Sequence, residues 1–73
     1  MKLLQEEFTH PTQASLVRLR IFPQPEGYLV TEEHQGAATV VRTLGLFDTR
    51  EDSEASVRTR AAELATQRYR QVS

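Results

Sequence analysis

The chain has 73 residues, of which ten are acidic and nine basic, and its net charge at neutral pH is −1. This length allows a single domain with a thin core, so we expect marginal stability unless a partner contributes to it. The absence of cysteine excludes disulfides, thiolate catalysis and zinc sites with cysteine ligands, and the near-neutral charge provides no long-range attraction to nucleic acid or anionic lipid.

Residues 1–13, MKLLQEEFTHPTQ, are expected to form an N-terminal tail that is either flexible or docked on the domain. Pro11 favours extended backbone at His10, which ends any helix in this segment. Glu6 and Glu7 interrupt the apolar stretch that a secretion signal requires. Nothing in the sequence approaches the roughly 20 apolar residues of a membrane span. We therefore expect a cytoplasmic protein that does not enter a membrane.

Three segments have the residue pattern of β-strands. Apolar and polar side chains alternate in SLVRLRIF, and β-branched residues are frequent in YLVTEEH and AATVVRTLGLF. Two prolines and a glycine in PQPEG predict a turn between the first two strands, and Gln35–Gly36 predicts a second turn. The sequence therefore predicts a three-stranded antiparallel meander.

The expected strand register assigns side chains to two faces, because directly opposed residues project to the same side of a sheet. If PQPEG is the whole first loop, Phe22 lies opposite Tyr28 and Arg18 lies opposite Glu32. The face expected to carry the core holds Val17, Leu19, Ile21, Leu29, Thr31, Val40, Leu44 and Leu46, with Glu33 and Arg42 as charged exceptions. The outer face is expected to hold Leu16, Arg18, Arg20, Phe22, Tyr28, Val30, Glu32, His34, Val41 and Thr43.

The segment after the third strand predicts a C-terminal helix. Asp48 and Thr49 are both good N-caps, acidic residues follow in the first turn, and no Gly or Pro interrupts residues 50–73. Apolar residues recur at spacings of three and four, which predicts a packed stripe of Val57, Ala61, Leu64, Ala65, Tyr69 and Val72. Arg60, Glu63, Gln67 and Arg70 are expected on the solvent side. The predicted fold is α+β: residues 14–73 form one βββα domain, with the helix packed on one face of the sheet.

Catalytic and metal sites have little support in the sequence. His34 and Glu32 share a predicted strand face, but no third ligand accompanies them. The serines lack a nucleophile-elbow motif and a nearby histidine, and the three glycines are too scattered for a phosphate-binding loop. We therefore expect no enzyme activity, no metal, no cofactor and no small-molecule substrate.

The outer sheet face is the predicted binding surface, since the helix covers only one side of the sheet. Its candidate binding residues are Arg18, Arg20, Phe22, Tyr28 and Thr43. We expect a small non-enzymatic module that binds protein, foremost a second copy of itself, through this face or through an exposed strand edge. The alternative is a nucleic-acid-binding domain that reads DNA with the same face.

Residues 44–62, LGLFDTREDSEASVRTRAA, resemble the strand-to-helix corner of the ethylene-response-factor DNA-binding family, with its Leu-Gly-x-Phe-Asp-Thr and Arg-x-Ala-Ala. The order of three strands and one helix is also similar to the arm-type DNA-binding domains of tyrosine integrases. The resemblance implies an outer sheet face laid in the DNA major groove, with Leu44 facing inward and Gly45 outward. The chain has Thr43 where the ethylene-response-factor family has tryptophan, and lacks that family's basic first strands.

Overall fold

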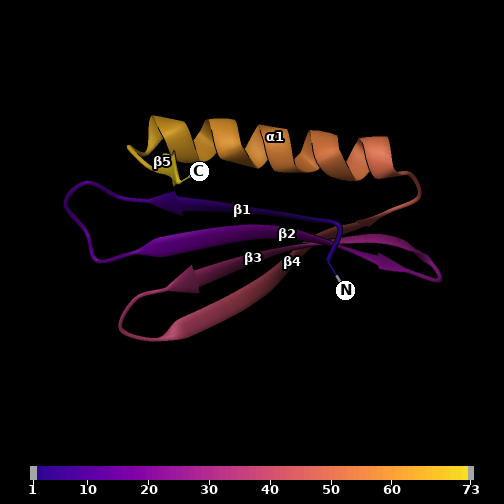
Figure 1. The fold of residues 1–73 in the computed structure, drawn as a ribbon, viewed down its shortest axis with the longest axis horizontal. Helices are drawn as coiled ribbons and strands as arrows, with labels where there is room; N and C mark the ends of the chain where they lie inside the picture. The colour runs from indigo at the N-terminus through magenta and orange to yellow at the C-terminus, as the bar shows by residue number, and fades with distance from the viewer. Residues whose placement is uncertain (1, 73) are drawn as a thin grey trace.

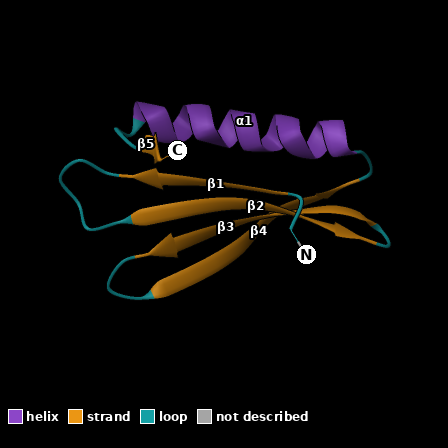
Figure 2. Cartoon of the chain, viewed as in Figure 1, coloured by secondary structure: helices purple, strands orange, loops and turns teal. Residues whose placement is uncertain are grey.

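The computed structural model describes residues 2–72 as one antiparallel sheet with a helix along one face (Figures 1 and 2). The sheet has five strands in the order β4-β3-β2-β1-β5. The elements are β1 (Leu4–Thr9), β2 (Leu16–Gln24), β3 (Gly27–Gln35), β4 (Thr39–Phe47), α1 (Arg50–Thr66) and β5 (Arg70–Val72). The α+β class is confirmed, but the prediction of a three-stranded βββα domain is wrong.

The first additional strand comes from the N-terminal segment that the sequence suggested as a tail. β1 lies antiparallel to β2, with Leu4 opposite Ile21 and Phe8 opposite Val17. Phe8 is buried and Leu4 packs against the buried core. Leu4 and Phe8 lie on the same face of the strand, but this short segment gains its interstrand hydrogen bonds only by pairing with β2 and β5.

The second additional strand forms because the helix ends earlier than expected. After the C-cap Gln67, Arg68 takes a left-handed conformation with φ of 71°. The amides of Arg68 and Tyr69 donate to the carbonyls of Ala65 and Leu64, the pattern of a Schellman motif. The chain then turns back, and β5 pairs with β1. Tyr69 and Val72 therefore do not extend the helical stripe; glycine, the usual sign of this ending, is absent.

The register of β2 and β3 differs by one residue from the predicted one. Gln24 pairs with Gly27, so that only Pro25–Glu26 forms the turn, and Arg18 lies opposite Glu33. A one-residue shift moves every side chain of a strand to the other face. The predicted outer-face residues Tyr28, Val30, Glu32 and His34 therefore lie on the helix side, and the predicted core residues Leu29 and Thr31 lie outside.

β4 also departs from its predicted pairing. Gln35 pairs with Thr39, which leaves Gly36–Ala38 as the loop, and a bulge at Leu44 interrupts the ladder. Leu44 packs against the core as expected. Gly45 lies opposite the buried Val30, so it faces inward rather than outward. Val40 and Leu46, both predicted core residues, are exposed.

The core lies between the sheet and the helix, and α1 contacts β2, β3 and β4. Val17, Leu19 and Ile21 are fully buried, as their alternation predicted. The buried apolar residues are Phe8, Val17, Leu19, Ile21, Val30, Val57 and Leu64. Thr49 caps the helix, since its hydroxyl accepts from the amide of Asp52 at 3.1 Å, which confirms one of the two predicted N-caps.

Candidate functional site

The structure brings together four of the five predicted binding residues. Arg18, Arg20 and Phe22 alternate with the buried residues of β2 and so lie on the outer face, and Thr43 lies on the same face opposite Thr31. Tyr28 lies on the helix side, partly buried against the core. The correction follows from the shifted register of β3. That these residues bind a partner stays a prediction.

The outer face carries carboxylates beside its arginines. Arg18 donates to Glu7 of β1 and lies 3.6 Å from Glu33 of β3. Arg20 lies 3.3 Å from Glu33 and donates to Gln5 at 3.0 Å. The hydrogen bond from Gln35 and the charges of the two arginines outweigh desolvation and hold the pKa of Glu33 below its usual value. The two cations are thus largely compensated within the sheet, and this arrangement does not favour nucleic acid.

A carboxylate lies buried on the opposite face of the sheet. Glu32 of β3 is 0% exposed. Arg60 of α1 donates to it through two nitrogens, at 2.6 and 3.2 Å, and His34 forms a further hydrogen bond with it. Arg42 of β4 lies 3.6 Å from the same carboxylate. Glu32 of β3 therefore links α1, through Arg60, to β4, through Arg42.

The pKa of Glu32 is set by opposing effects. Burial disfavours the ionised form, but hydrogen bonds from Arg60 and His34, together with the charges of Arg60 and Arg42, outweigh it and lower the pKa of Glu32. Arg60 was expected on the solvent side of the helix, yet its side chain is only 17% exposed. Its spacing from Val57 and Leu64, three and four residues, places it on the packed stripe and could have revealed this role.

The lowered pKa predicts an acid-sensitive contribution to stability. The pKa of Glu32 in the folded protein lies below the usual value of 4.5. The stabilisation is therefore complete above that usual value and is lost as the pH falls through the folded pKa. We expect wild type to exceed Glu32→Gln in free energy of unfolding at neutral pH, and this difference to shrink on acidification. Urea unfolding of both proteins across pH checks it; a difference that is independent of pH would contradict the prediction.

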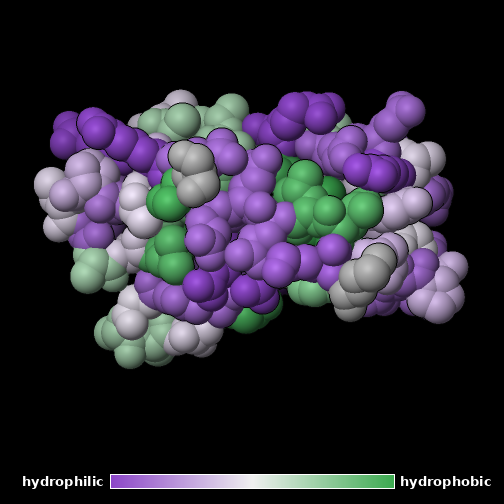
Figure 3. Space-filling model, viewed as in Figure 1, coloured by the Kyte–Doolittle hydropathy of each residue, from purple (hydrophilic) through white to green (hydrophobic). Residues whose placement is uncertain are grey.

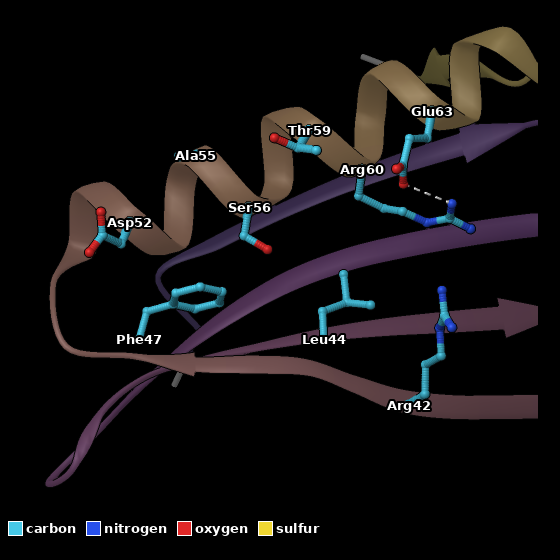
Figure 4. A pocket seen from close by; sticks show the side chains of 9 residues that line it. All are labelled: Arg42, Leu44, Phe47, Asp52, Ala55, Ser56, Thr59, Arg60 and Glu63. Atoms are coloured by element: carbon cyan, nitrogen blue, oxygen red, sulfur yellow. Dashed lines mark hydrogen bonds and ion pairs between the residues drawn. The ribbon is translucent and has the colours of Figure 1, made fainter.

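An open groove of about 560 Å³ runs between α1 and β4. Leu44 and Phe47 point from β4 toward the helix, and Ser56 and Thr59 lie on the helical wall (Figure 4). Arg42 rises from β4 at one end, near Arg60 and Glu63, which are joined by a hydrogen bond of 3.2 Å (Figure 4). The remaining lining residues are Asp52 and Ala55. The groove combines an apolar floor with a charged end, at which Arg42 and Arg60 lie beside Glu63.

The strand beneath this groove is also an edge of the sheet. β4 pairs only with β3, so one side of its backbone has no neighbouring strand within the described residues. Val40 and Val41, on opposite faces of β4, are 59% and 60% exposed. The other edge is the three-residue strand β5. Native sheets normally shorten or charge their edges, and β4, with nine residues and one charge, does neither.

Figure 3 shows one face of the molecule in the orientation of Figure 1. Hydrophilic side chains cover most of that face, and the hydrophobic groups form separate patches. Over residues 2–72, no three His, Cys, Asp or Glu side chains are grouped as metal ligands. No helix in the described chain is long and apolar enough to cross a membrane.

Comparisons with known proteins assign the chain to no family. No protein-family model matches the chain, and no curated protein and no solved structure is significantly similar to it. The resemblance of residues 44–62 to the ethylene-response-factor corner stays a prediction.

Proposed function

We propose that this chain is a small non-enzymatic interaction module that associates with a second copy of itself along the edge strand β4. The observation that carries the proposal is the long unpaired edge of β4 with Val40 and Val41 exposed on it. An added strand would satisfy the free backbone groups and cover both valines. The thin core of a chain of 73 residues adds a reason for association.

The edge is favoured over the outer sheet face because of the charges on that face. Arg18 and Arg20 are already engaged by Glu7 and Glu33. A partner that covered this face would remove water from these charged side chains, and its own contacts would have to offset that desolvation cost. Phe22 and Leu29 are only partly buried on the outer face, but β4 exposes its apolar side chains more fully and has unpaired backbone beside them.

The regular part of β4 favours one register for two copies. It extends from Thr39, after the loop, to Thr43, before the bulge at Leu44, so an antiparallel pair that uses this whole stretch is centred on Val41. Val41 then lies opposite Val41 of the second copy, Thr39 opposite Thr43, and Val40 opposite Arg42. A shift by one residue in each strand would instead place Arg42 directly opposite Arg42, which like charges disfavour.

Charge substitutions at Val41 test both the interface and its register. Val41→Glu and Val41→Lys place like charges opposite each other at the two-fold axis and remove apolar burial. We expect each to weaken association by about 100-fold. A mixture of the two variants should associate again, because Glu then faces Lys. Sedimentation velocity of each variant and of the mixture measures the effect.

The matched control is Val72→Lys, which places the same charge on the opposite edge strand β5, where Val72 is also exposed. It should associate as wild type does. Wild type that stays monomeric at micromolar concentration would overturn the proposal. A dimer that is insensitive to charge at Val41, or a Val41→Glu and Val41→Lys mixture that does not associate, would overturn the β4 interface.

A further inference from the structure

We propose that the dimer binds a small organic dianion, of phosphate-ester or dicarboxylate chemistry, between the Arg42 side chains of its two copies. This inference rests on the proposed β4 interface. The proposed ligand lies in the groove between α1 and β4, at the end where Arg42 is exposed. When the two β4 edges meet, both copies contribute to this site.

The first observation concerns the free binding capacity of Arg42. Its side chain is 58% exposed, and within the described chain the one carboxylate closer than 4 Å to it is Glu32, at 3.6 Å. Glu63 at the same end of the groove is paired with Arg60. The same Glu32 oxygen already accepts from Arg60 and from His34. Arg60, by contrast, has contacts to Glu32 and Glu63 through all three of its nitrogens. Arg42 therefore retains donors that an external anion could use.

In the proposed dimer, the two copies of Arg42 lie close to each other. With Val40 opposite Arg42 of the second copy, the two Arg42 residues are diagonal neighbours on the same face of the joined sheet. Diagonal neighbours lie about 7–8 Å apart, within reach of long side chains. Two guanidinium groups at this separation repel each other. An anion with two negative charges, bound between them, would accept charge-assisted hydrogen bonds from both and offset the repulsion.

The groove indicates that the anion carries an organic part. Its floor of Leu44 and Phe47 lies directly beyond Arg42, and Ser56 and Thr59 offer hydroxyls along the wall. Its volume of about 560 Å³ falls within the range of small-molecule sites, about 300–1,000 Å³. An aromatic or aliphatic group attached to the anion would cover these apolar side chains, which a bare inorganic ion would leave in water.

The test measures the dimerisation constant by sedimentation at matched ionic strength in chloride, inorganic phosphate and phenyl phosphate. We expect both phosphates to tighten association of wild type relative to chloride, phenyl phosphate by about tenfold and more than inorganic phosphate. Arg42→Gln should dimerise more tightly than wild type in chloride, because the repulsion is removed, and should not respond to phosphate. Arg58→Gln, which removes an exposed arginine of α1, is the matched control and should behave as wild type.

Each further outcome has a definite meaning. A dimer that responds to charge at Val41 but has the same constant in all three anions would overturn the ligand site and leave the interface standing. The same phosphate response in Arg42→Gln would also overturn the site. Equal effects of the two phosphates would overturn the part played by Leu44 and Phe47. Wild type that is monomeric in every anion would overturn both the site and the proposed function.

Discussion

Arg60→Met is expected to lower the free energy of unfolding by about 3 kcal/mol, because it leaves the fully buried carboxylate of Glu32 without its main partner. Methionine keeps the unbranched apolar stem of arginine, so the packing on α1 changes little. His34 and Arg42 remain near the carboxylate but make fewer hydrogen bonds to it than Arg60. Urea unfolding monitored by circular dichroism measures the loss.

Two further variants separate the charge effect from packing. Arg58→Met makes the same change at an exposed position of the same helix and should alter stability by less than about 0.5 kcal/mol. Adding Glu32→Leu to Arg60→Met removes the uncompensated charge and should recover much of the lost stability, since an apolar pair often replaces a buried ion pair at little cost. A double variant less stable than Arg60→Met would contradict this account of the cluster.

Gly27→Ala is expected to destabilise the protein by about 3 kcal/mol or more. Gly27 has φ of 150°, a conformation that residues with a side chain rarely adopt. A Cβ atom there would also lie 2.3 Å from the carbonyl oxygen of Phe47, so the end of β4 would have to move. Because Gly27 ends the tight turn between β2 and β3, the strain acts on the register of the two central strands.

Gly36→Ala provides the matched control for this substitution. A Cβ atom at Gly36 meets only the carbonyl oxygen of Ala14, at an ordinary distance of 3.7 Å, and the residue has no positive φ. Its free energy of unfolding should stay within about 0.5 kcal/mol of wild type. Equal losses for the two variants in urea unfolding would show that the turn at Gly27 is not under the constraint described.

The candidate site was accessible to sequence analysis only in part. Arg18, Arg20 and Phe22 were correctly placed on the outer face, since the alternation in β2 is strict and its buried partners are all apolar. Tyr28 was placed on the wrong face because PQPEG contains two prolines and was interpreted as a loop throughout. In the structure, Pro23 and Gln24 belong to β2, and only Pro25–Glu26 turns.

The free edge of β4 and the groove beside it were even harder to predict from the sequence. An exposed strand edge was part of the hypothesis, but its identity as β4 depends on β1, which covers the other side of β2. The β1 segment gains its stability from pairing with β2 and with β5, which lies at the other end of the chain. No local pattern measures that energy.

By itself, the sequence determined the α+β class, the strand segments of β2, β3 and β4, the inward face of β2, and a helix start at Asp48 or Thr49. These features arise from alternation, β-branching and capping, which act between residues close in the chain. Only the tertiary structure decided the register of β3, the added strands β1 and β5, and the burial of Glu32 with Arg60. The register of β3 depends on whether two or five residues form the turn after β2, a choice that packing of the whole sheet decides. β1 and β5 form because each finds an unpaired strand edge. Glu32 is buried because Arg60, 28 residues further along the chain, supplies a cation from the helix.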